Sequence, residues 1–198
     1  MERKVIAVVG SYRRGGTIDQ AVEAVLAGAR EKGAATQTIY LTERKLEFCT
    51  NCRKCTETPG PERGRCVLQD DMEPLLAEIE AADSVVLAAP VNFFHVTAIF
   101  RLFMERLIPY AYWPWGRALP RLRSMKNTRK AVLISSAAMP GYMIPIFSSA
   151  TRALRVTAKM LGAKSVGRLW IGLAGHEPQQ ALPAAKLARA RRLGWRLA

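Results

Sequence analysis

The sequence predicts an α/β fold in which a parallel β-sheet of five strands carries helices on both faces. Two observations support this class. Short apolar runs alternate along the chain with stretches whose apolar residues recur at helical spacing. The runs "VIAVV" and "SVVLAA" are apolar throughout, as is typical of strands buried on both faces of a sheet. Because right-handed crossovers place helices on either side of a parallel sheet, we expect a doubly wound arrangement.

The expected strands are short, apolar and bounded by turn or polar residues. They span residues 5–9, 36–41, 84–89, 131–136 and 166–173. A chain of 198 residues is long enough for one such domain with a full core and short for two. We therefore expect residues 1–198 to form a single domain.

The expected helices follow these strands and carry recognisable end signals. They span residues 18–32, a segment that begins after Asp70 and Asp71, and residues 96–108, 146–161 and 183–197. Gly33 suits the position just after the first helix, and the two aspartates suit the positive end of the second. Pro183 suits the first turn of the last helix.

Candidate site loops are those at the carboxyl ends of the strands, where ligands bind in a doubly wound sheet. They are residues 10–17, 46–71, 90–95 and 136–142. The first, "GSYRRGGT", is a glycine-rich turn between a strand and a helix, where free amides and the positive helix end favour a phosphate. It lacks the lysine of a nucleoside-triphosphate loop and the second glycine of the dinucleotide fingerprint.

The turn that remains suits a terminal monophosphate. The expected ligands are the hydroxyls of Ser11 and Thr17, the amides of Gly15, Gly16 and Thr17, and the cation of Arg13 or Arg14. After the third strand, "APVNFFH" can offer backbone amides and the rings of Phe93 and Phe94 to the same edge. The alternative is that these rings only fix the following helix. The segment that includes Ser136 and Gly141 is a candidate third wall.

All four cysteines fall in the loop at residues 46–70, with the spacing C-x2-C-x2-C-x10-C: Cys49, Cys52, Cys55 and Cys66. This clustering argues against structural disulfides, and a zinc site prefers two separated C-x2-C pairs. Three thiolates at three-residue intervals and a fourth further along can hold a four-iron cluster. The alternatives are spare thiols or a disulfide in oxidised preparations. The flexible Pro/Gly-rich insert before the last cysteine can either reach back or stay disordered.

Charge is unevenly distributed along the chain, whose net charge is +14. Acidic and basic residues are nearly balanced over residues 1–116, whereas Glu177 is the single acidic residue of the basic half, 117–198. This half is either a solvated surface or a surface for an anionic partner. Because no aromatic and basic nucleic-acid motif accompanies the charge, we do not expect nucleic acid. No apolar run approaches the ~18 residues of a membrane span, so we expect no membrane partner and a cytoplasmic protein.

In order and spacing, these blocks resemble the flavodoxin-like NAD(P)H-dependent FMN reductases and, within them, the iron–sulfur flavoproteins. The resemblance rests on "GSYRRGGT", the four cysteines, Asp70-Asp71-Met72, "PVNFF" at 90–94 and "FMER" at 103–106. It is strongest from residue 4 to residue 106. Tyr12, Thr17 and Asn92 stand where the family often has Pro, Asn and Tyr.

The resemblance implies a flavodoxin-like fold with strand order 2-1-3-4-5, and FMN as the cofactor. The family's phosphate loop matches Ser11, Arg13, Gly15, Gly16 and Thr17, and its isoalloxazine loop matches Pro90, Val91, Asn92, Phe93 and Phe94. It further implies hydride transfer from NAD(P)H to the flavin, with no catalytic side chain. Electrons then pass to a flavin, quinone or nitroaromatic, or through a cysteine-bound 4Fe-4S cluster to a partner protein. The alternative is an electron carrier or redox sensor without efficient NAD(P)H oxidation.

Two further segments have open interpretations. The aromatic stretch at residues 108–116 is either a dimer contact or lid over a flavin, or a loop packed on its own domain. With it, we expect a homodimer or homotetramer. The basic run at 121–130 either meets the 2′-phosphate of NADPH or is a solvated edge.

Overall fold

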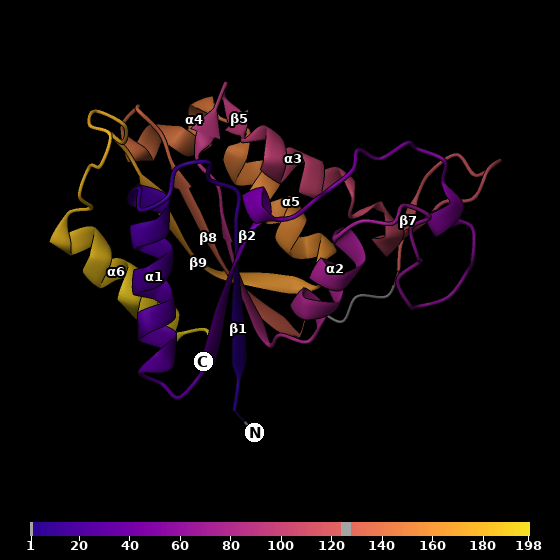
Figure 1. Ribbon diagram of the computed structural model, residues 1–198, viewed down its shortest axis with the longest axis horizontal. Helices are drawn as coiled ribbons and strands as arrows, with labels where there is room; N and C mark the ends of the chain where they lie inside the picture. Colours follow the sequence, from indigo (N-terminus) through magenta and orange to yellow (C-terminus); the bar gives the residue numbers. More distant parts are fainter. Residues whose placement is uncertain (1, 124–127) are drawn as a thin grey trace.

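The computed structural model describes residues 2–123 and 128–198, and its centre is the predicted five-stranded parallel sheet (Figure 1). The strand order is β2-β1-β3-β8-β9, and every pairing in this sheet is parallel. In the order of the predicted strands this is 2-1-3-4-5, so the flavodoxin-like topology is confirmed. Residues 124–127 of the basic run lie outside the described residues.

The strands of the sheet agree closely with those predicted. They are β1 (Lys4–Val9), β2 (Ala35–Tyr40), β3 (Ser84–Ala88), β8 (Arg129–Ser136) and β9 (Ala163–Ile171). Two hairpins that the sequence analysis did not predict pair β4 (Val91–Asn92) with β5 (His95–Val96), and β6 (Ala111–Tyr112) with β7 (Arg121–Leu122). The helices are α1 (Thr17–Arg30), α2 (Met72–Glu80), α3 (Ala98–Glu105), α4 (Ile144–Phe147), α5 (Ala150–Met160) and α6 (Ala184–Trp195). Short 3-10 turns are η1 (Leu41–Glu43), η2 (Lys54–Thr56), η3 (Ile108–Tyr110) and η4 (Gly141–Met143).

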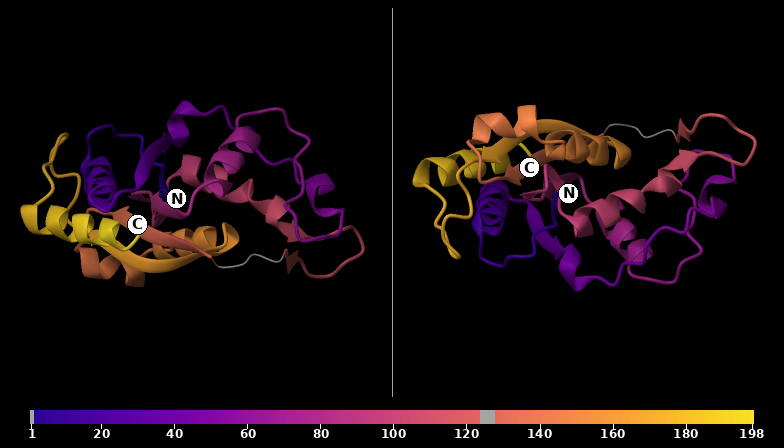
Figure 2. Two further views of the ribbon diagram at one scale, coloured as in Figure 1. Left: turned by 90° about the horizontal axis from the view of Figure 1, so that it is seen from below. Right: turned by 90° about the horizontal axis from the view of Figure 1, so that it is seen from above.

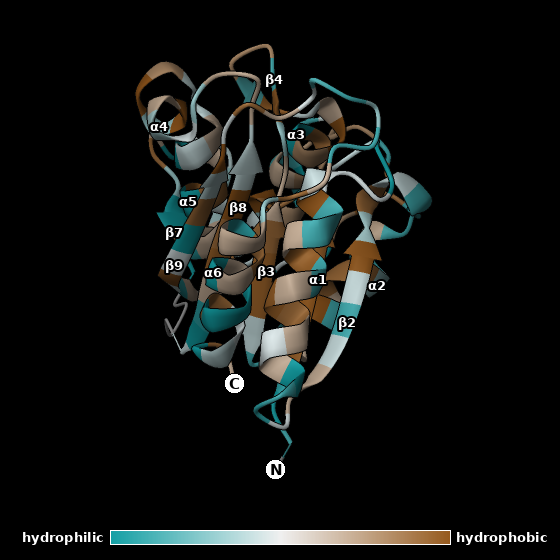
Figure 3. Cartoon of the chain, turned by 90° about the vertical axis from the view of Figure 1, so that its left-hand side faces the viewer, coloured by the Kyte–Doolittle hydropathy of each residue, from teal (hydrophilic) through white to brown (hydrophobic). Residues whose placement is uncertain are grey.

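The sheet is covered on both faces, as the continuous apolar strands predict (Figures 1 and 3). Alternate residues of β1 point to opposite faces, with Ile6 in one core cluster and Val5 in the other. The Ile6 cluster includes buried residues of α2, α3 and α5, such as Phe100. The Val5 cluster includes residues of α1 and α6, such as Leu26. No helix of the described residues has the length and apolar character that crossing a membrane requires.

Helices α1 and α6 pack with their backbones unusually close. A Cβ atom on Gly28 would lie 2.0 Å from the carbonyl oxygen of Arg191, and one on Gly194 would lie 1.9 Å from that of Val25. No side chain fits at either place, so both glycines are required for the contact between these helices.

The helix predicted at 146–161 is divided. Between α4 and α5, Ser148 has an extended backbone with φ −135° and ψ 139°. Its hydroxyl accepts a hydrogen bond at 3.0 Å from the amide of Ala150, the first residue of α5. The helix is interrupted at Ser148. The hydroxyl of Ser148 satisfies the amide of Ala150, which a continuous helix would bond to a backbone carbonyl.

Strand β9 forms one edge of the sheet, and cations of α6 cover its backbone. Three side chains of α6 or its end donate to carbonyl oxygens of β9. The pairs are Lys186 with Trp170 (3.2 Å), Arg189 with Arg168 (3.4 Å) and Arg196 with Val166 (3.2 Å). Part of the positive charge of the basic half therefore has a structural role at this edge.

Candidate cofactor site

A cavity of about 610 Å³ opens at the carboxyl edge of the sheet, where the loops after β1, β3, β8 and β9 meet. Predicted residues from three of these loops line it: Ser11, Arg13, Gly16, Thr17, Pro90, Val91, Asn92 and Ser136. Segments that are far apart in the sequence thus meet at one place. The cavity is polar near the phosphate loop and offers small side chains on the side of β8.

The phosphate loop presents an uncapped helix end to this cavity. Gly16 is the N-cap of α1, and no side chain caps that end. The first amides of α1 are therefore available to an anion at the positive end of the helix. The buried hydroxyl of Ser11 holds the turn itself, because it accepts from the amide of Arg13 at 3.2 Å and donates to the carbonyl oxygen of Arg13 at 3.1 Å. The Arg13 side chain lies along Gly16 and lines the cavity.

Gly15 and Arg14 lie outside the lining of this cavity. The amide of Gly15, whose φ is +70°, donates to the carboxylate of Asp19 at 2.8 Å. The guanidinium of Arg14 pairs with Glu43 and covers the ring of Tyr40. Of the two candidate arginines, Arg13 is therefore the one that faces the cavity, and the predicted amide contact of Gly15 would need the loop to rearrange.

Phe93 and Phe94 form the tip of the β4–β5 hairpin and do not line the cavity. Both have left-handed backbones, with φ of +50° and +63°. This is the conformation of a two-residue type I′ hairpin turn, which normally selects Asn and Gly. Phe93 is fully exposed, and Phe94 is 63% exposed. The amide of Ser149 donates to the carbonyl oxygen of Phe94 at 2.8 Å and anchors the tip to the start of α5.

Gly141, the second residue of the expected third wall, also lies outside the cavity lining. It begins η4, where its backbone packs against the end of β9. A Cβ atom on Gly172 would lie 2.0 Å from the amide nitrogen of Gly141. Gly141 therefore holds the loop after β8 against the loop after β9, while Ser136 lines the cavity.

The loop after β9 belongs to the site and was missed by the sequence analysis. Ala174 and Gly175 line the cavity, as do Tyr12 and Ala137. Gln20 of α1 connects this loop to the phosphate loop. Its side-chain amide nitrogen donates to the carbonyl oxygens of Gly15 (2.9 Å) and Gln180 (3.0 Å). The available signal was the glycine-bearing segment that follows the fifth strand at the same edge.

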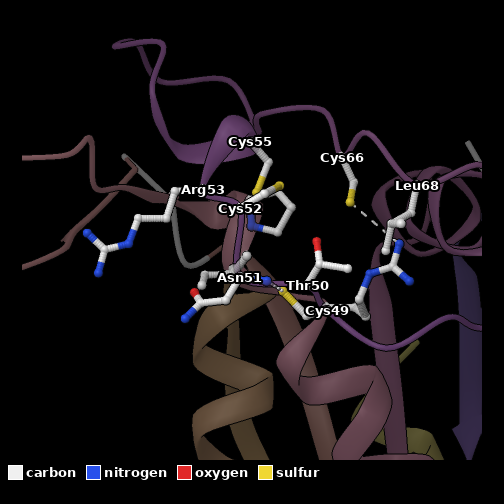
Figure 4. Close-up of a pocket in the computed structure, with 11 residues that line it drawn as sticks. Cys49, Thr50, Asn51, Cys52, Arg53, Cys55, Cys66 and Leu68 are labelled. Atoms are coloured by element: carbon white, nitrogen blue, oxygen red, sulfur yellow. Dashed lines mark hydrogen bonds between the residues drawn. The ribbon is translucent and has the colours of Figure 1, made fainter.

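The four cysteines come together in a second, smaller cavity (Figure 4), in a loop at the end of the molecule away from α6 (Figure 2). All four line it, and the space they enclose is about 10 Å³. Cys55 is buried and Cys52 is exposed. Burial, and to a smaller extent the charges of the other three cysteines, raise the pKa of the Cys55 thiol to about 11.

The backbone around these cysteines suits an anionic sulfur group. Asn51 and Arg53, on either side of Cys52, both have left-handed backbones with φ of 54° and 60°. Such turns form concave nests of amides that bind anions, including iron–sulfur clusters. The amide of Asn51 already donates to the sulfur of Cys49 at 3.4 Å. Among the described residues, no group of three or more His, Cys, Asp or Glu is arranged for a single metal ion.

Four cysteine thiols that line one cavity are the donor type that could hold an iron–sulfur cluster. The space between the sulfurs holds about one water molecule. Cluster binding would require the loop to open on its accessible side, where Cys52 is exposed.

The Pro/Gly-rich insert reaches back, which decides between the two alternatives for that segment. A Cβ atom on Gly64 would lie 1.8 Å from the carbonyl oxygen of Cys55, so the end of the insert packs directly against the third cysteine. Arg63 forms ion pairs with Glu73 and Glu80 of α2. The buried Arg123 donates to the carbonyl oxygens of Cys55, Gly60 and Pro109.

The aromatic stretch at 108–116 packs on its own domain, against the cysteine loop. Thr56 donates through its hydroxyl to the carbonyl oxygen of Trp113 at 2.9 Å, and the amide of Trp113 donates back to the carbonyl oxygen of Thr56. The guanidinium carbon of Arg53 lies 3.7 Å from the ring centre of Trp113 and 4.3 Å from that of Trp115. Trp115 is 64% exposed, so this end of the segment keeps a free aromatic surface.

The chain is similar to known flavoproteins and to a solved oxidoreductase structure. An iron–sulfur flavoprotein of Archaeoglobus fulgidus is 32% identical over 111 residues, which are 56% of this chain and 48% of that protein. One from Methanocaldococcus jannaschii is 33% identical over 106 residues, 54% of this chain and 52% of that protein. The chain thus spans about half the length of the curated relatives it matches.

A solved structure of an NAD(P)H:quinone oxidoreductase from Methanothermobacter marburgensis superposes with a TM-score of 0.69 and 19% identity, and each chain is fully covered. At that identity the likeness shows the fold. The model of the family described as "NADPH-dependent FMN reductase" matches residues 3–175, which include both cavities. The chain therefore belongs to the NADPH-dependent FMN reductase family.

Proposed function

We propose that the protein is an FMN-dependent oxidoreductase that takes hydride from NAD(P)H and passes electrons to a small acceptor such as a flavin, a quinone or a nitroaromatic. The observation that carries this proposal is the 610 Å³ cavity, where the uncapped end of α1 faces the loops after β3 and β8. Family membership supports the choice of FMN and of a reduced nicotinamide.

In this proposal the phosphate group binds at the amino end of α1. Arg13 supplies the cation, Thr17 a hydroxyl donor, and the amides of Gly16 and Thr17 complete a site for a dianion. Ser11 keeps the turn in shape through its two contacts with the Arg13 backbone.

The segment from Pro90 to Asn92 is the wall for the ring system. FMN, when bound, supplies the hydride acceptor, so the protein needs no acid or base of its own. The small residues Ser136 and Ala137 leave the opposite side open for a nicotinamide or an acceptor.

The test is a fluorescence titration of folded apoprotein with FMN and with riboflavin, followed by NADPH and NADH oxidation with added quinone or nitroaromatic. We expect FMN to bind more tightly than riboflavin, because riboflavin has no phosphate, and we expect acceptor-dependent nicotinamide oxidation. A folded protein that binds neither flavin would refute the proposal.

A second candidate function is favoured by the cysteine cavity. The four thiols would hold a 4Fe-4S cluster, and the protein would act as an electron carrier or redox sensor for a partner protein. Support comes from the four cysteines that line one cavity, from the left-handed turns at Asn51 and Arg53, and from the relatives named iron-sulfur flavoprotein. About four iron atoms per chain after anaerobic reconstitution, with slow NAD(P)H oxidation, would favour this function. Background iron with four free thiols would exclude it.

Exposed apolar side chains on segments that follow β3 and β8 also suggest a contact between subunits. Large apolar side chains are exposed on the β4–β5 hairpin and on η4 and α4, and we call this set the apolar rim: Phe93, Phe94, Tyr142, Ile146 and Phe147. Exposed apolar patches of this kind mark interaction sites. We propose that the rim is a contact in a homodimer or homotetramer. Light scattering should then show an oligomer that Ile146→Glu dissociates, and a monomeric wild type would contradict it.

A further inference from the structure

Arg106 is a buried cation in the cysteine cavity. It directly follows α3 and is 2% exposed, and its guanidinium lines the same space as the four thiols. It donates to the carbonyl oxygen of Glu47 at 2.6 Å and forms a two-point pair with Asp70, whose side chain is 1% exposed. The nitrogen that bonds Asp70 at 3.0 Å also donates to the sulfur of Cys66 at 3.7 Å (Figure 4).

This arrangement distinguishes Cys66 from the other cysteines. Within residues 2–123 and 128–198, Cys66 has the one sulfur that accepts a hydrogen bond from a charged group, whereas the Cys49 sulfur accepts from an uncharged amide. An arginine stays protonated under all ordinary conditions, so its charge next to Cys66 is permanent. Asp70 lies against the same guanidinium and partly cancels that charge.

A purely structural ion pair would not need the third contact. The Arg106–Asp70 pair ties the end of α3 to the segment before α2, and the remaining donor could bond any backbone oxygen. Buried ion pairs also contribute little net stability compared with apolar packing. A guanidinium directed at a sulfur, in the cavity that all four cysteines share, would offset the negative charge that the sulfurs would carry as cluster ligands.

We propose that Arg106 is a positioning residue that raises the reduction potential of an iron–sulfur cluster held by the four cysteines, and that Asp70 limits this effect. The inference rests on the cluster-binding form of the proposed function. Reduction adds one electron and forms or breaks no bond, so the cluster and its thiolates gain one negative charge. Hydrogen bonds to the sulfurs and nearby charges are established determinants of such potentials.

Substitutions of Arg106 and of Asp70 should shift the reduction potential in opposite directions, which a merely structural role of the pair would not produce. Arg106→Gln removes the cation, so reduction should become at least tenfold less favourable, about 59 mV lower for a one-electron couple. Asp70→Asn removes the opposing anion, and the potential should rise. Arg63→Gln is the matched control, because it also removes a cation from the cysteine loop. Within the described residues, the guanidinium of Arg63 bonds Glu73 and Glu80 and no cysteine sulfur, so this variant should leave the potential unchanged.

The experiment is anaerobic reconstitution of each variant, iron analysis, and a dithionite titration followed by electron paramagnetic resonance. If single variants fold poorly, the double variant Arg106→Gln/Asp70→Asn leaves no unpaired buried charge, and its potential should lie below that of wild type. Iron-loaded variants with unchanged potentials, or single variants that shift in the same direction, would overturn the role of Arg106. A wild-type protein that takes up no iron would instead overturn the cluster itself, and with it this inference.

Discussion

The tip of the β4–β5 hairpin stores backbone strain that substitution should release. Phe93 and Phe94 occupy the left-handed region at φ +50° and +63°, where residues with a Cβ atom are disfavoured. We consider Phe93→Asn combined with Phe94→Gly, the pair that a type I′ turn prefers. The hairpin hydrogen bonds of β4 and β5 do not depend on these side chains, so the fold should persist.

The magnitude follows from the two positions. A left-handed conformation costs roughly 1–2 kcal/mol for each residue with a Cβ atom, and Asn tolerates it better than Phe. The added glycine lowers the free energy of unfolding by about 0.5–1 kcal/mol, because it gives the unfolded chain more conformational freedom. Phe93 is fully exposed, so its removal sacrifices no burial. The net expectation is a gain of about 1–2 kcal/mol in the free energy of unfolding. For a chain of this length that raises Tm by roughly 2–8 °C.

The assay is thermal and denaturant unfolding of dilute apoprotein, with the single variants as controls. Unchanged or reduced stability of the double variant at concentrations where the protein is monomeric would refute the strain argument. If the apolar rim is a subunit contact, the same variant should weaken association at high concentration. Stability and assembly would then move in opposite directions, as expected for strain retained at a functional site.

Three further outcomes are expected. Arg13→Gln should weaken FMN binding at least tenfold and leave riboflavin binding unchanged. The control is Arg14→Gln, which should change neither affinity, because the guanidinium of Arg14 pairs with Glu43. Equal losses of affinity for both flavins would contradict the assignment of Arg13. Gly28→Ala should lower the free energy of unfolding by about 1–3 kcal/mol in denaturant titrations, because its Cβ atom meets the α6 backbone at 2.0 Å, and a neutral result would contradict that contact. Burial favours protonation of Asp70, but hydrogen bonds from Arg106 and two backbone amides hold its pKa below the usual value. The contribution of Asp70 to the free energy of unfolding should therefore be complete above about pH 4 and decrease as the pH falls through its pKa in the folded protein. Asp70→Asn should make the free energy of unfolding depend less steeply on pH below pH 4. An unchanged dependence on pH would contradict this.

Much of the fold was predictable because its signals are local. Apolar runs and end signals located the five strands, and the carboxyl-edge rule brought the loops around Ser11, Asn92 and Ser136 to one cavity. The hairpin at Phe93 was not predictable, since neither Asn nor Gly marks its turn. The α1–α6 contact depends on Gly28 and Gly194, which are far apart in the sequence, so no local pattern reveals it.

The site was harder to predict wherever a residue acts against its usual tendency. Arg106 belongs to the "FMER" block of the resemblance, but because arginine is expected at the surface, its burial among the cysteines was not predicted. Gly15 fits a phosphate loop by type, but its amide bonds Asp19 four residues along. The part played by Gly175 depends on how the loop after β9 folds back, which Gln20 determines from another helix.

The cover over β9 has a consequence for how this chain behaves in concentrated solution. An uncovered outer strand invites the strand of a neighbouring molecule to pair with it and so to start a fibre. Here Lys186, Arg189 and Arg196 already satisfy three of its oxygens, and their charges repel a second molecule presenting the same surface. We expect replacement of these three side chains with glutamine to remove the charge repulsion and so to favour pairing of β9 strands between molecules.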